Sequence, residues 1–262
     1  MIAGSAGARI AYEVRGDGAP LTLVHGLAYD RRGWGRLPDL LAERFRVVLV
    51  DNRGVGESDA PPGPYTVAQM AADVIGVLDD AGIERTSVLG VSLGGYIAQQ
   101  VALAAPERVE RLVLVSTAPG GPKAHPMPAA TVEVFARYPT MEREAGLRMF
   151  VENSLGARGV RELPDLVEEI LRYRLERAPT VDAWRAQATA GATFDASERV
   201  GEISAPTLVV HGGADVVVDP RNAALLGELI PGARVEVVPD RGHLLIWEDS
   251  PRLAEFVTEF LT

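Results

Sequence analysis

Ser92 lies between glycines in a pattern suited to nucleophilic catalysis. Glycines stand two positions before and two positions after it, as Gly90-Val91-Ser92-Leu93-Gly94. The flanking apolar runs predict a buried strand that ends at the serine and a helix that begins directly after it. A sharp strand-to-helix turn leaves no room for a Cβ at those two positions. The competing interpretation is a structural glycine turn, but the strand and helix on either side favour a nucleophile.

A serine hydroxyl needs a histidine to accept its proton. The chain has four histidines, His25, His125, His211 and His243. In folds with this kind of turn, the order along the chain is serine, acid, histidine. If His211 were the base, the acid would have to lie between Ser92 and His211. Outside a long helical region, no loop in that interval offers a carboxylate. We therefore predict that His243 is the base.

A carboxylate must orient the imidazole of the base and stabilise its cation. The ends of buried parallel strands are where ligands sit, which makes Asp215 the preferred candidate. Asp219 is the alternative, and Asp240 is interpreted as a turn residue. The predicted strand at 111–116 ends without an acid.

A tetrahedral intermediate needs two N–H groups that face its oxyanion. One is expected from Leu93, the residue after the nucleophile, and the other from Leu27 in the loop HGLA after an early strand. Gly26 lets that loop turn. The side chain of His25 is expected to bond backbone groups and to support this site without transferring protons.

Short β-branched runs alternate with helical segments along most of the chain. The alternating segment 8–14 is typical of an edge strand, and the remaining apolar runs predict strands buried on both faces of a mostly parallel sheet. These runs lie at 21–26, 46–51, 87–92, 111–116, 207–212 and 234–240. Helical periodicity is seen at 66–80, 93–105 and 221–230, with Thr66 as N-cap and Gly82 as the stop of the first. The pattern predicts a doubly wound α/β sheet.

The alternation breaks after a proline- and glycine-rich linker. Only helices are predicted beyond it, at roughly 128–137, 140–154, 162–177 and 180–190. A run of helices between two strands of such a sheet indicates a cap over the sheet edge. We expect residues 1–118 and 201–262 to form the core and residues 119–200 to form the cap.

Composition narrows the class of protein. The 262 residues carry a net charge of −10, which disfavours a nucleic-acid partner, because phosphate binding needs a basic surface. The absence of cysteine excludes disulfides, thiolate catalysis and cysteine-ligated metals. No apolar run reaches the ~18 residues of a membrane helix, and no signal peptide is evident. We expect a cytoplasmic protein that acts on a small molecule, with the oligomeric state open and a homodimer as one option.

Five segments together resemble the α/β-hydrolase superfamily, and in particular its small esterases and 3-oxoadipate enol-lactonases. In order they are HGLA at 25, DNRGVGESD at 51, GVSLGG at 90, HGGAD at 211 and RGHLLIWEDSP at 241. The resemblance implies an eight-stranded sheet, a helical cap after the sixth strand, a Ser–Asp–His triad and no cofactor or metal. It assigns Ser92, Asp215 and His243 to the triad and Leu27 and Leu93 to the oxyanion hole. Arg53 and Asp51 are expected to pair and hold their loop.

We expect hydrolysis of a carboxylic ester with a small to medium, largely apolar acyl group. Candidate pocket residues are His25, Phe135, Met149, Trp184 and Leu244, although cap residues such as these also serve to pack the cap on the sheet. Arg31 and Arg32 are weaker candidates for binding a carboxylate. The alternatives are an enol-lactonase or a C–C bond hydrolase, which the Trp247-Glu248 pair permits, a cofactor-free haloperoxidase or perhydrolase, and a ligand-binding member without hydrolytic activity.

Overall fold

A single eight-stranded sheet forms the centre of the molecule. The computed structural model describes residues 1–5 and 7–262. The strand order is β1-β2-β4-β3-β5-β6-β7-β8; β1 and β2, and β2 and β4, run antiparallel, whereas all other neighbours are parallel. The predicted mostly parallel sheet is therefore confirmed. The strands are β1 (Ile2–Ser5), β2 (Ala8–Arg15), β3 (Ala19–Val24), β4 (Phe45–Val50), β5 (Thr86–Val91), β6 (Val109–Val115), β7 (Thr207–Gly212) and β8 (Arg234–Val238).

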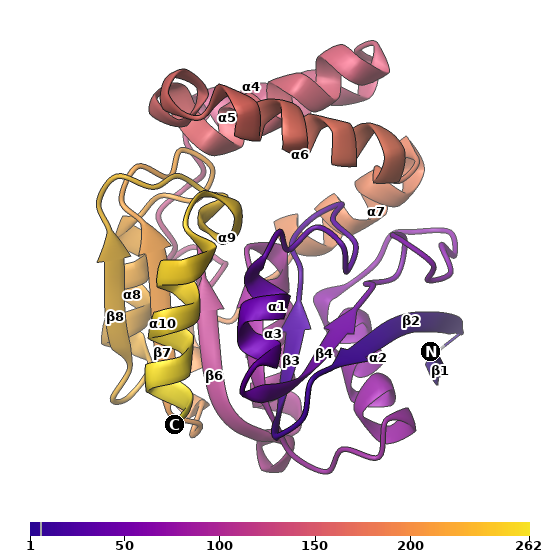
Figure 1. Ribbon diagram of the computed structural model, residues 1–262, viewed down its shortest axis with the longest axis vertical. Coiled ribbons are helices and arrows are strands. Elements are labelled where there is room, and N and C mark those ends of the chain that lie inside the picture. The colour runs from indigo at the N-terminus through magenta and orange to yellow at the C-terminus, as the bar shows by residue number, and fades with distance from the viewer. Residues whose placement is uncertain (6) are drawn as a thin grey trace.

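Helices cover both faces of the sheet, as burial of parallel strands requires. One face packs against α2 (Val67–Asp80), α3 (Leu93–Ala104) and α8 (Arg221–Leu229). The other packs against α1 (Leu37–Ala42), α9 (Leu245–Glu248) and α10 (Ser250–Leu261). Figure 1 shows the strands sandwiched between these two layers. Short 3₁₀ segments lie at Pro106–Arg108, Tyr138–Thr140 and Val200–Glu202.

Helix α2 begins and ends where its sequence predicts. The Thr66 side chain accepts a hydrogen bond from the Gln69 amide, and the Gln69 side chain accepts one from the Thr66 amide, which completes a capping box. Gly82 follows the helix with a φ of 64°. The amide of Ile83 then bonds the Leu78 carbonyl, as in a Schellman motif.

Two strand predictions are wrong. Segment 8–14 is not an edge strand, because β1 pairs along its outer side. β1 has only four residues, two of them Gly4 and Ser5, so its pattern is too short to predict a strand. β8 is not buried on both faces: it forms the opposite edge, and Val235 and Val237 are 36% and 45% exposed.

The segment between β6 and β7 is helical, and we refer to its helices α4–α7 as the cap helices. They are α4 (Ala129–Arg137), α5 (Arg143–Glu162), α6 (Pro164–Arg177) and α7 (Val181–Ala192). They lie above the carboxyl ends of the parallel strands (Figure 1). α5 extends beyond the predicted end at 154, because the chain kinks at Gly156, with a φ of 68°, and resumes as helix until Pro164 opens α6. The division into a core and a cap domain stays a prediction.

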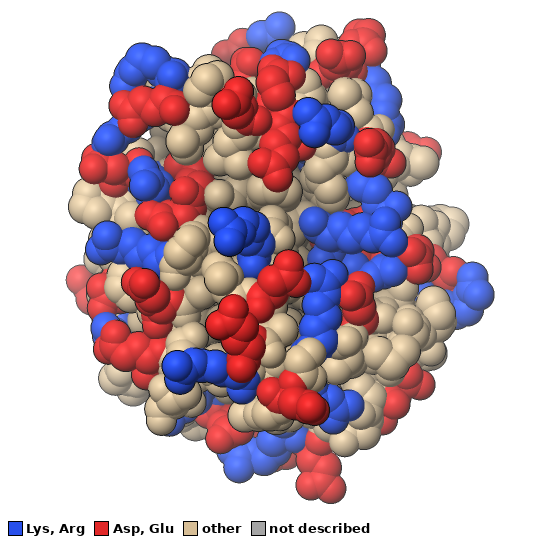
Figure 2. All heavy atoms as spheres, viewed as in Figure 1, with Lys and Arg blue, Asp and Glu red and all other residues tan. Residues whose placement is uncertain are grey.

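Acidic and basic side chains alternate over the surface seen in Figure 2. Several form exposed pairs, such as Arg9 with Asp59 at 3.0 Å and Arg148 with Glu168 at 2.7 Å. Each such pair contributes about 0–1 kcal/mol to stability. Over residues 1–5 and 7–262, no helix has the length and apolarity needed to span a bilayer.

Candidate active site

The turn at Ser92 has the strained backbone that its sequence predicts. β5 ends at Val91, α3 begins at Leu93, and Ser92 between them has a φ of 54° and a ψ of −119°. A Cβ on Gly90 would lie 2.1 Å from the Gly94 carbonyl oxygen, and a Cβ on Gly94 would lie 1.9 Å from the Val24 carbonyl oxygen. Backbone atoms therefore occupy the space that side chains would need, so both positions require glycine.

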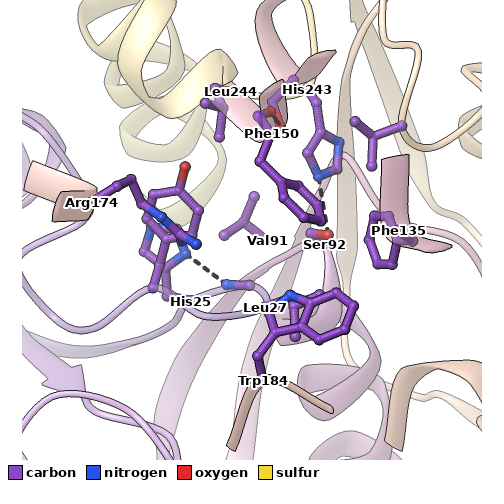
Figure 3. A pocket seen from close by; sticks show the side chains of 14 residues that line it. His25, Leu27, Val91, Ser92, Phe135, Phe150, Arg174, Trp184, His243 and Leu244 are labelled. Carbon is purple, nitrogen blue, oxygen red and sulfur yellow. Dashed lines mark hydrogen bonds between the residues drawn. The ribbon is translucent and has the colours of Figure 1, made fainter. Parts of the chain in front are cut away.

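Ser92, His243 and Asp215 form one chain of hydrogen bonds. His243 Nε2 lies 3.1 Å from Ser92 Oγ, as Figure 3 shows, and His243 Nδ1 lies 2.8 Å from Asp215 Oδ2. Because a carboxylate only accepts hydrogen bonds, Nδ1 carries the proton and Nε2 is free to accept the serine proton. The imidazole thus has the tautomer that a general base needs.

Asp215 is buried and fully hydrogen-bonded. Oδ1 accepts from the amides of Val217 and Val218 at 2.7 and 2.9 Å, and Oδ2 accepts from His243 and from His211 Nε2, the latter at 3.1 Å. Burial by itself would raise the pKa of Asp215. The nearby His243 and the hydrogen bonds from both histidines outweigh burial and hold that pKa well below its ordinary value. The carboxylate therefore stays ionised.

His211 is a second histidine on the same carboxylate, a role that sequence reasoning missed. Its Nε2 lies 3.1 Å from Asp215 Oδ2 and also 3.1 Å from the Val218 carbonyl oxygen. Both partners are acceptors, so Nε2 carries the proton. Sequence reasoning considered His211 only as a base and excluded it, and the geometry places it behind Asp215.

The two N–H groups predicted to hold an oxyanion are free. In the described part of the chain, the amides of Leu27 and Leu93 donate to no other group. Both residues line the hollows around Ser92. Gly26 packs against Ser92, since a Cβ there would lie 3.0 Å from the serine Cβ. The loop after β3 therefore lies against Ser92.

His25 occupies a structural position beside this loop. Its Nδ1 accepts the Gly26 amide at 2.7 Å and its Nε2 donates to the Gly33 carbonyl at 2.9 Å. Burial lowers the pKa of His25 to about 3, so the ring is neutral. It stacks on Tyr29 with 4.6 Å between ring centroids. These contacts agree with the expected backbone-bonding role, although the ring also lines a hollow.

Two hollows meet at Ser92 and share Leu27, Phe135 and Val217. The first encloses about 590 Å³, including its open mouth, and its lining includes Tyr29, Phe150, Arg174, Trp184, His243 and Leu244 (Figure 3). The second has about 940 Å³ of empty space, again including its open mouth. It is lined by Leu93, Tyr96, Met127, Val132, Gln187, Ala188, Gly191, Ala192 and Val218. Most of these side chains are apolar.

Of the predicted pocket residues, His25, Phe135, Trp184 and Leu244 line the first hollow, but Met149 does not. Met149 packs inside the cap, in a cluster that includes Tyr138, Leu147 and Leu171. Phe150, the next residue on α5, lies in the first hollow near Ser92 instead (Figure 3).

Arg174 is a buried cation in the first hollow that sequence reasoning missed. It is 3% exposed, donates from Nη1 to the Ala28 carbonyl at 2.8 Å and lies 4.4 Å over the ring of Tyr29. Within residues 1–5 and 7–262 it forms no ion pair, and its Nε has no hydrogen-bond partner. A guanidinium without a carboxylate partner can bind an anionic group of a ligand.

The arginines considered from the sequence have other partners. Arg31 pairs with buried Asp51 and lies 2.9 Å from Glu57, so it is not available for substrate. Arg53 does not pair with Asp51 as predicted; it binds Asp73 through two contacts of 2.6 and 2.7 Å. Each aspartate is thus matched to an arginine about 20 positions away, and loop proximity gave the wrong pair.

Three other predicted positions lie outside the site. Arg32 is exposed, and its nearest acidic partner is Glu57 at 3.8 Å. Asp219, the alternative acid, pairs with Arg221 at 2.5 Å. Asp240 pairs with Arg158 of α5 and is exposed. Neither aspartate contacts His243, which leaves Asp215 as the carboxylate beside that histidine.

The loop that carries His243 is held on two sides. The His243 amide donates to the Ser154 carbonyl of α5 at 2.9 Å, and the Gly242 amide donates to both oxygens of Glu248 at 3.0 and 3.1 Å. Burial raises the pKa of Glu248 to about 7, although the Gly242 amide opposes that shift. Trp247 lies against Tyr173 and Gly35, outside the hollows.

No group of three or more histidine or acidic side chains in the described residues is arranged to hold a metal ion.

The fold and the strand–turn–helix at Ser92 define the class of protein. The chain belongs to the α/β hydrolase fold family, whose model matches residues 19–250.

Several relatives of this chain are named as hydrolases. A 2-hydroxy-6-oxononadienedioate/2-hydroxy-6-oxononatrienedioate hydrolase from Burkholderia vietnamiensis is 33% identical over 270 residues, which span 97% of this chain and 91% of that protein. The enol-lactonase from Burkholderia xenovorans LB400 superposes with a TM-score of 0.86 at 26% identity, covering 100% of this chain and 99% of that one. A thermophilic esterase from Thermogutta terrifontis has a TM-score of 0.86 at 28% identity, with 100% and 97% covered. The chain is thus a hydrolase of the α/β hydrolase family.

Proposed function

We propose that the chain is a serine hydrolase that cleaves a carboxylic ester through an acyl-enzyme. The observation that carries this proposal is the continuous hydrogen-bond chain from Ser92 Oγ through His243 to Asp215. It lies at a strained turn and beside two free backbone amides. This combination of nucleophile, oriented base and oxyanion donors supports acyl transfer.

The proposed reaction has two halves. Ser92 Oγ attacks the ester carbonyl carbon while its proton moves to His243 Nε2, and the carbonyl oxygen, now negative, accepts hydrogen bonds from the Leu27 and Leu93 amides. The C–O bond to the alcohol then breaks, and the alcohol leaves with the proton from His243. Water next adds to the acyl-enzyme with His243 as base, which releases the acid and restores Ser92. The Asp215 carboxylate stabilises the imidazolium in both halves.

The two hollows supply space for the two halves of an ester. Ser92 lies where they meet, so a carbonyl carbon placed there extends its acyl group into one hollow and its leaving group into the other. The apolar lining by Phe135, Phe150 and Trp184 favours a hydrocarbon acyl or alcohol chain of small to medium size.

Arg174 favours a second candidate, hydrolysis of a C–C bond in a substrate that carries a carboxylate. Such a substrate presents a ketone to Ser92 and an anionic group to a cation in the same hollow. The relative from Burkholderia vietnamiensis is named for a dioate, a doubly anionic substrate. The proposed site serves either candidate, because both begin with a carbonyl beside Ser92.

Hydrolysis of p-nitrophenyl esters from acetate to decanoate, by wild type and by Ser92→Ala, tests the first candidate. We expect turnover that Ser92→Ala reduces by at least about 10⁴-fold, as for loss of a nucleophile in other serine hydrolases. Turnover that survives the substitution contradicts the proposal. The chain-length optimum measures the size of the acyl site.

Arg174→Met tests whether Arg174 binds an anionic group, and a keto acid substrate then separates the two candidates. With a neutral p-nitrophenyl ester and a p-nitrophenyl monoester of a dicarboxylic acid, a role in anion binding predicts that KM rises about tenfold or more for the anionic ester alone. Wild type is then given a dienol keto acid, whose cleavage is followed by loss of its absorbance. Rapid cleavage, with slow turnover of every simple ester, favours the C–C candidate over the ester candidate.

A further inference from the structure

A buried carboxamide joins the cap helices to the loops after β3 and β4. Gln187 of α7 is fully buried. Its Oε1 accepts the Ala28 amide at 2.8 Å and its Nε2 donates to the Arg53 carbonyl at 2.8 Å. These partners lie 159 and 134 positions away along the chain, in the loops after β3 and β4. Trp184, one turn earlier on α7, lies beside Leu27 (Figure 3).

The residue that Gln187 holds is strained. Ala28 has a φ of 64°, in the left-handed region that a residue with a Cβ adopts only when its surroundings hold it there. Its carbonyl accepts Arg174 Nη1 at 2.8 Å, so cap side chains bind both its N–H and its C=O. Ala28 directly follows Leu27, which lines the Ser92 hollows and whose amide donates to no other group in the described residues.

The other end of the carboxamide is anchored on a rigid loop. Arg53, whose carbonyl accepts Gln187 Nε2, binds Asp73 of α2 through two short contacts, and both side chains are buried. The carboxamide can therefore hold Ala28 at a fixed position relative to this loop. Rotation of Gln187 away from Ala28 would leave the Ala28 amide buried without a partner, which is costly.

We propose that Gln187 is a positioning residue for the oxyanion hole: by holding Ala28, it aims the Leu27 N–H at the oxygen that becomes negative beside Ser92. The inference rests on the proposed function, because it assigns Leu27 to transition-state stabilisation. In this proposal the cap helices contribute to catalysis through Gln187 and also line the pocket. The effect is on kcat, since the developing charge exists only in the transition state.

Gln187→Met removes both hydrogen bonds and keeps the side-chain length. Gln187→Glu keeps an acceptor for the Ala28 amide. The matched control is Asn222→Leu, because Asn222 is also a fully buried carboxamide that binds the backbone of a distant residue. Its Oδ1 accepts the His125 amide at 2.9 Å and its Nδ2 donates to the His125 carbonyl at 3.0 Å. The Asn222 carboxamide contacts the linker before α4 and, at 3.1 Å, the Asp219 carbonyl, and it does not touch the loop at 26–29.

Four quantities are measured for each variant: kcat, KM, the inhibition constant of phenylboronic acid and that of the product acid. The boronic acid forms a tetrahedral adduct with Ser92 and so reports on the oxyanion site, whereas the product acid reports on ground-state binding. For Gln187→Met we expect kcat to fall roughly 10- to 100-fold, boronate affinity to fall by a similar factor, and KM and product affinity to change less than about threefold. Gln187→Glu should lie between Gln187→Met and wild type, and Asn222→Leu should keep kcat within about twofold.

Equal losses of kcat and boronate affinity in Gln187→Met and Asn222→Leu overturn the inference, because general loosening of the fold then explains both. Losses confined to KM also overturn it. Should Gln187→Met fail to fold, the Gln187→Glu values decide by the same criteria. Failure of the proposed function looks different: wild type is then inactive on every ester, or Ser92→Ala retains activity, before any variant of Gln187 is compared.

Discussion

Replacing Gly94 by alanine tests the geometry of the Ser92 turn directly. An alanine Cβ at this position would lie 1.9 Å from the Val24 carbonyl oxygen and 2.7 Å from that of His25. Both are backbone atoms at the end of β3, which pairs with β4 and β5 on its two sides and so cannot rotate away. The start of α3 must therefore move away from the loop that carries Leu27.

The size of that movement follows from the contact distance. Real Cβ contacts do not fall below 3.0 Å, so the helix and the strand must separate by about 1 Å, and a misplacement of about 1 Å in an active site costs roughly 10²-fold in turnover. The same movement separates the Leu27 and Leu93 amides, because one lies on each side of the contact. Overpacking of this kind also lowers the free energy of unfolding, here by roughly 3 kcal/mol.

Ester hydrolysis and urea unfolding measure the two effects on the same sample. Gly201→Ala is the control, since its Cβ would meet only the Leu229 carbonyl oxygen at 3.4 Å, an ordinary contact. We expect Gly94→Ala to lose at least about 100-fold in kcat under conditions where the protein is still folded, while Gly201→Ala stays near wild type. A Gly94→Ala enzyme with wild-type kcat and stability would refute the description of the turn.

Two further predictions concern groups beside the site. Asp73→Ala leaves Arg53 buried without its carboxylate and should lower the free energy of unfolding by about 3–5 kcal/mol in a urea titration; a loss below about 1 kcal/mol contradicts a buried ion pair there. Burial raises the pKa of Glu248 from 4.5 to about 7. Between these two pH values the folded chain keeps a proton that the unfolded chain releases, so the free energy of unfolding falls as pH rises from about 4.5 to about 7. Glu248→Gln removes this loss, and calorimetry at about pH 5 and about pH 8 should find the variant stabilised relative to wild type by about 2 kcal/mol more at the higher pH; an equal difference at both pH values contradicts the raised pKa.

The sheet and the residues around Ser92 were predictable because their signals are local. Gly90 reflects a contact with Gly94 four residues on, and Thr66 marks the start of α2 through a bond to Gln69 three residues on. β1 and the extension of α5 past Gly156 were missed for the converse reason. Four residues, two of them Gly4 and Ser5, are too few to show a period, and a kink within a helix has the sequence pattern of a helix end.

The partners of buried polar groups could not be predicted, because they depend on how distant elements dock. Gln187 meets Ala28 and Arg53 only once α7 lies over the loops after β3 and β4. Arg174 reads in the sequence as one arginine among several on α6, and its burial results from the packing of α6 over Tyr29. The pattern of charges along the chain does not indicate which charged side chains become buried.

The bond from the His243 amide to α5 bears on how such proteins acquire new substrates. Its acceptor is the main-chain carbonyl of Ser154, so any sequence that keeps the path of α5 supplies the same bond. Phe150, one turn earlier on that helix, faces the substrate hollow through its side chain. Variation at Phe150 can therefore reshape the cavity while the main chain that supports the histidine persists. In directed evolution, side chains of α5 are positions where specificity can change separately from the chemistry.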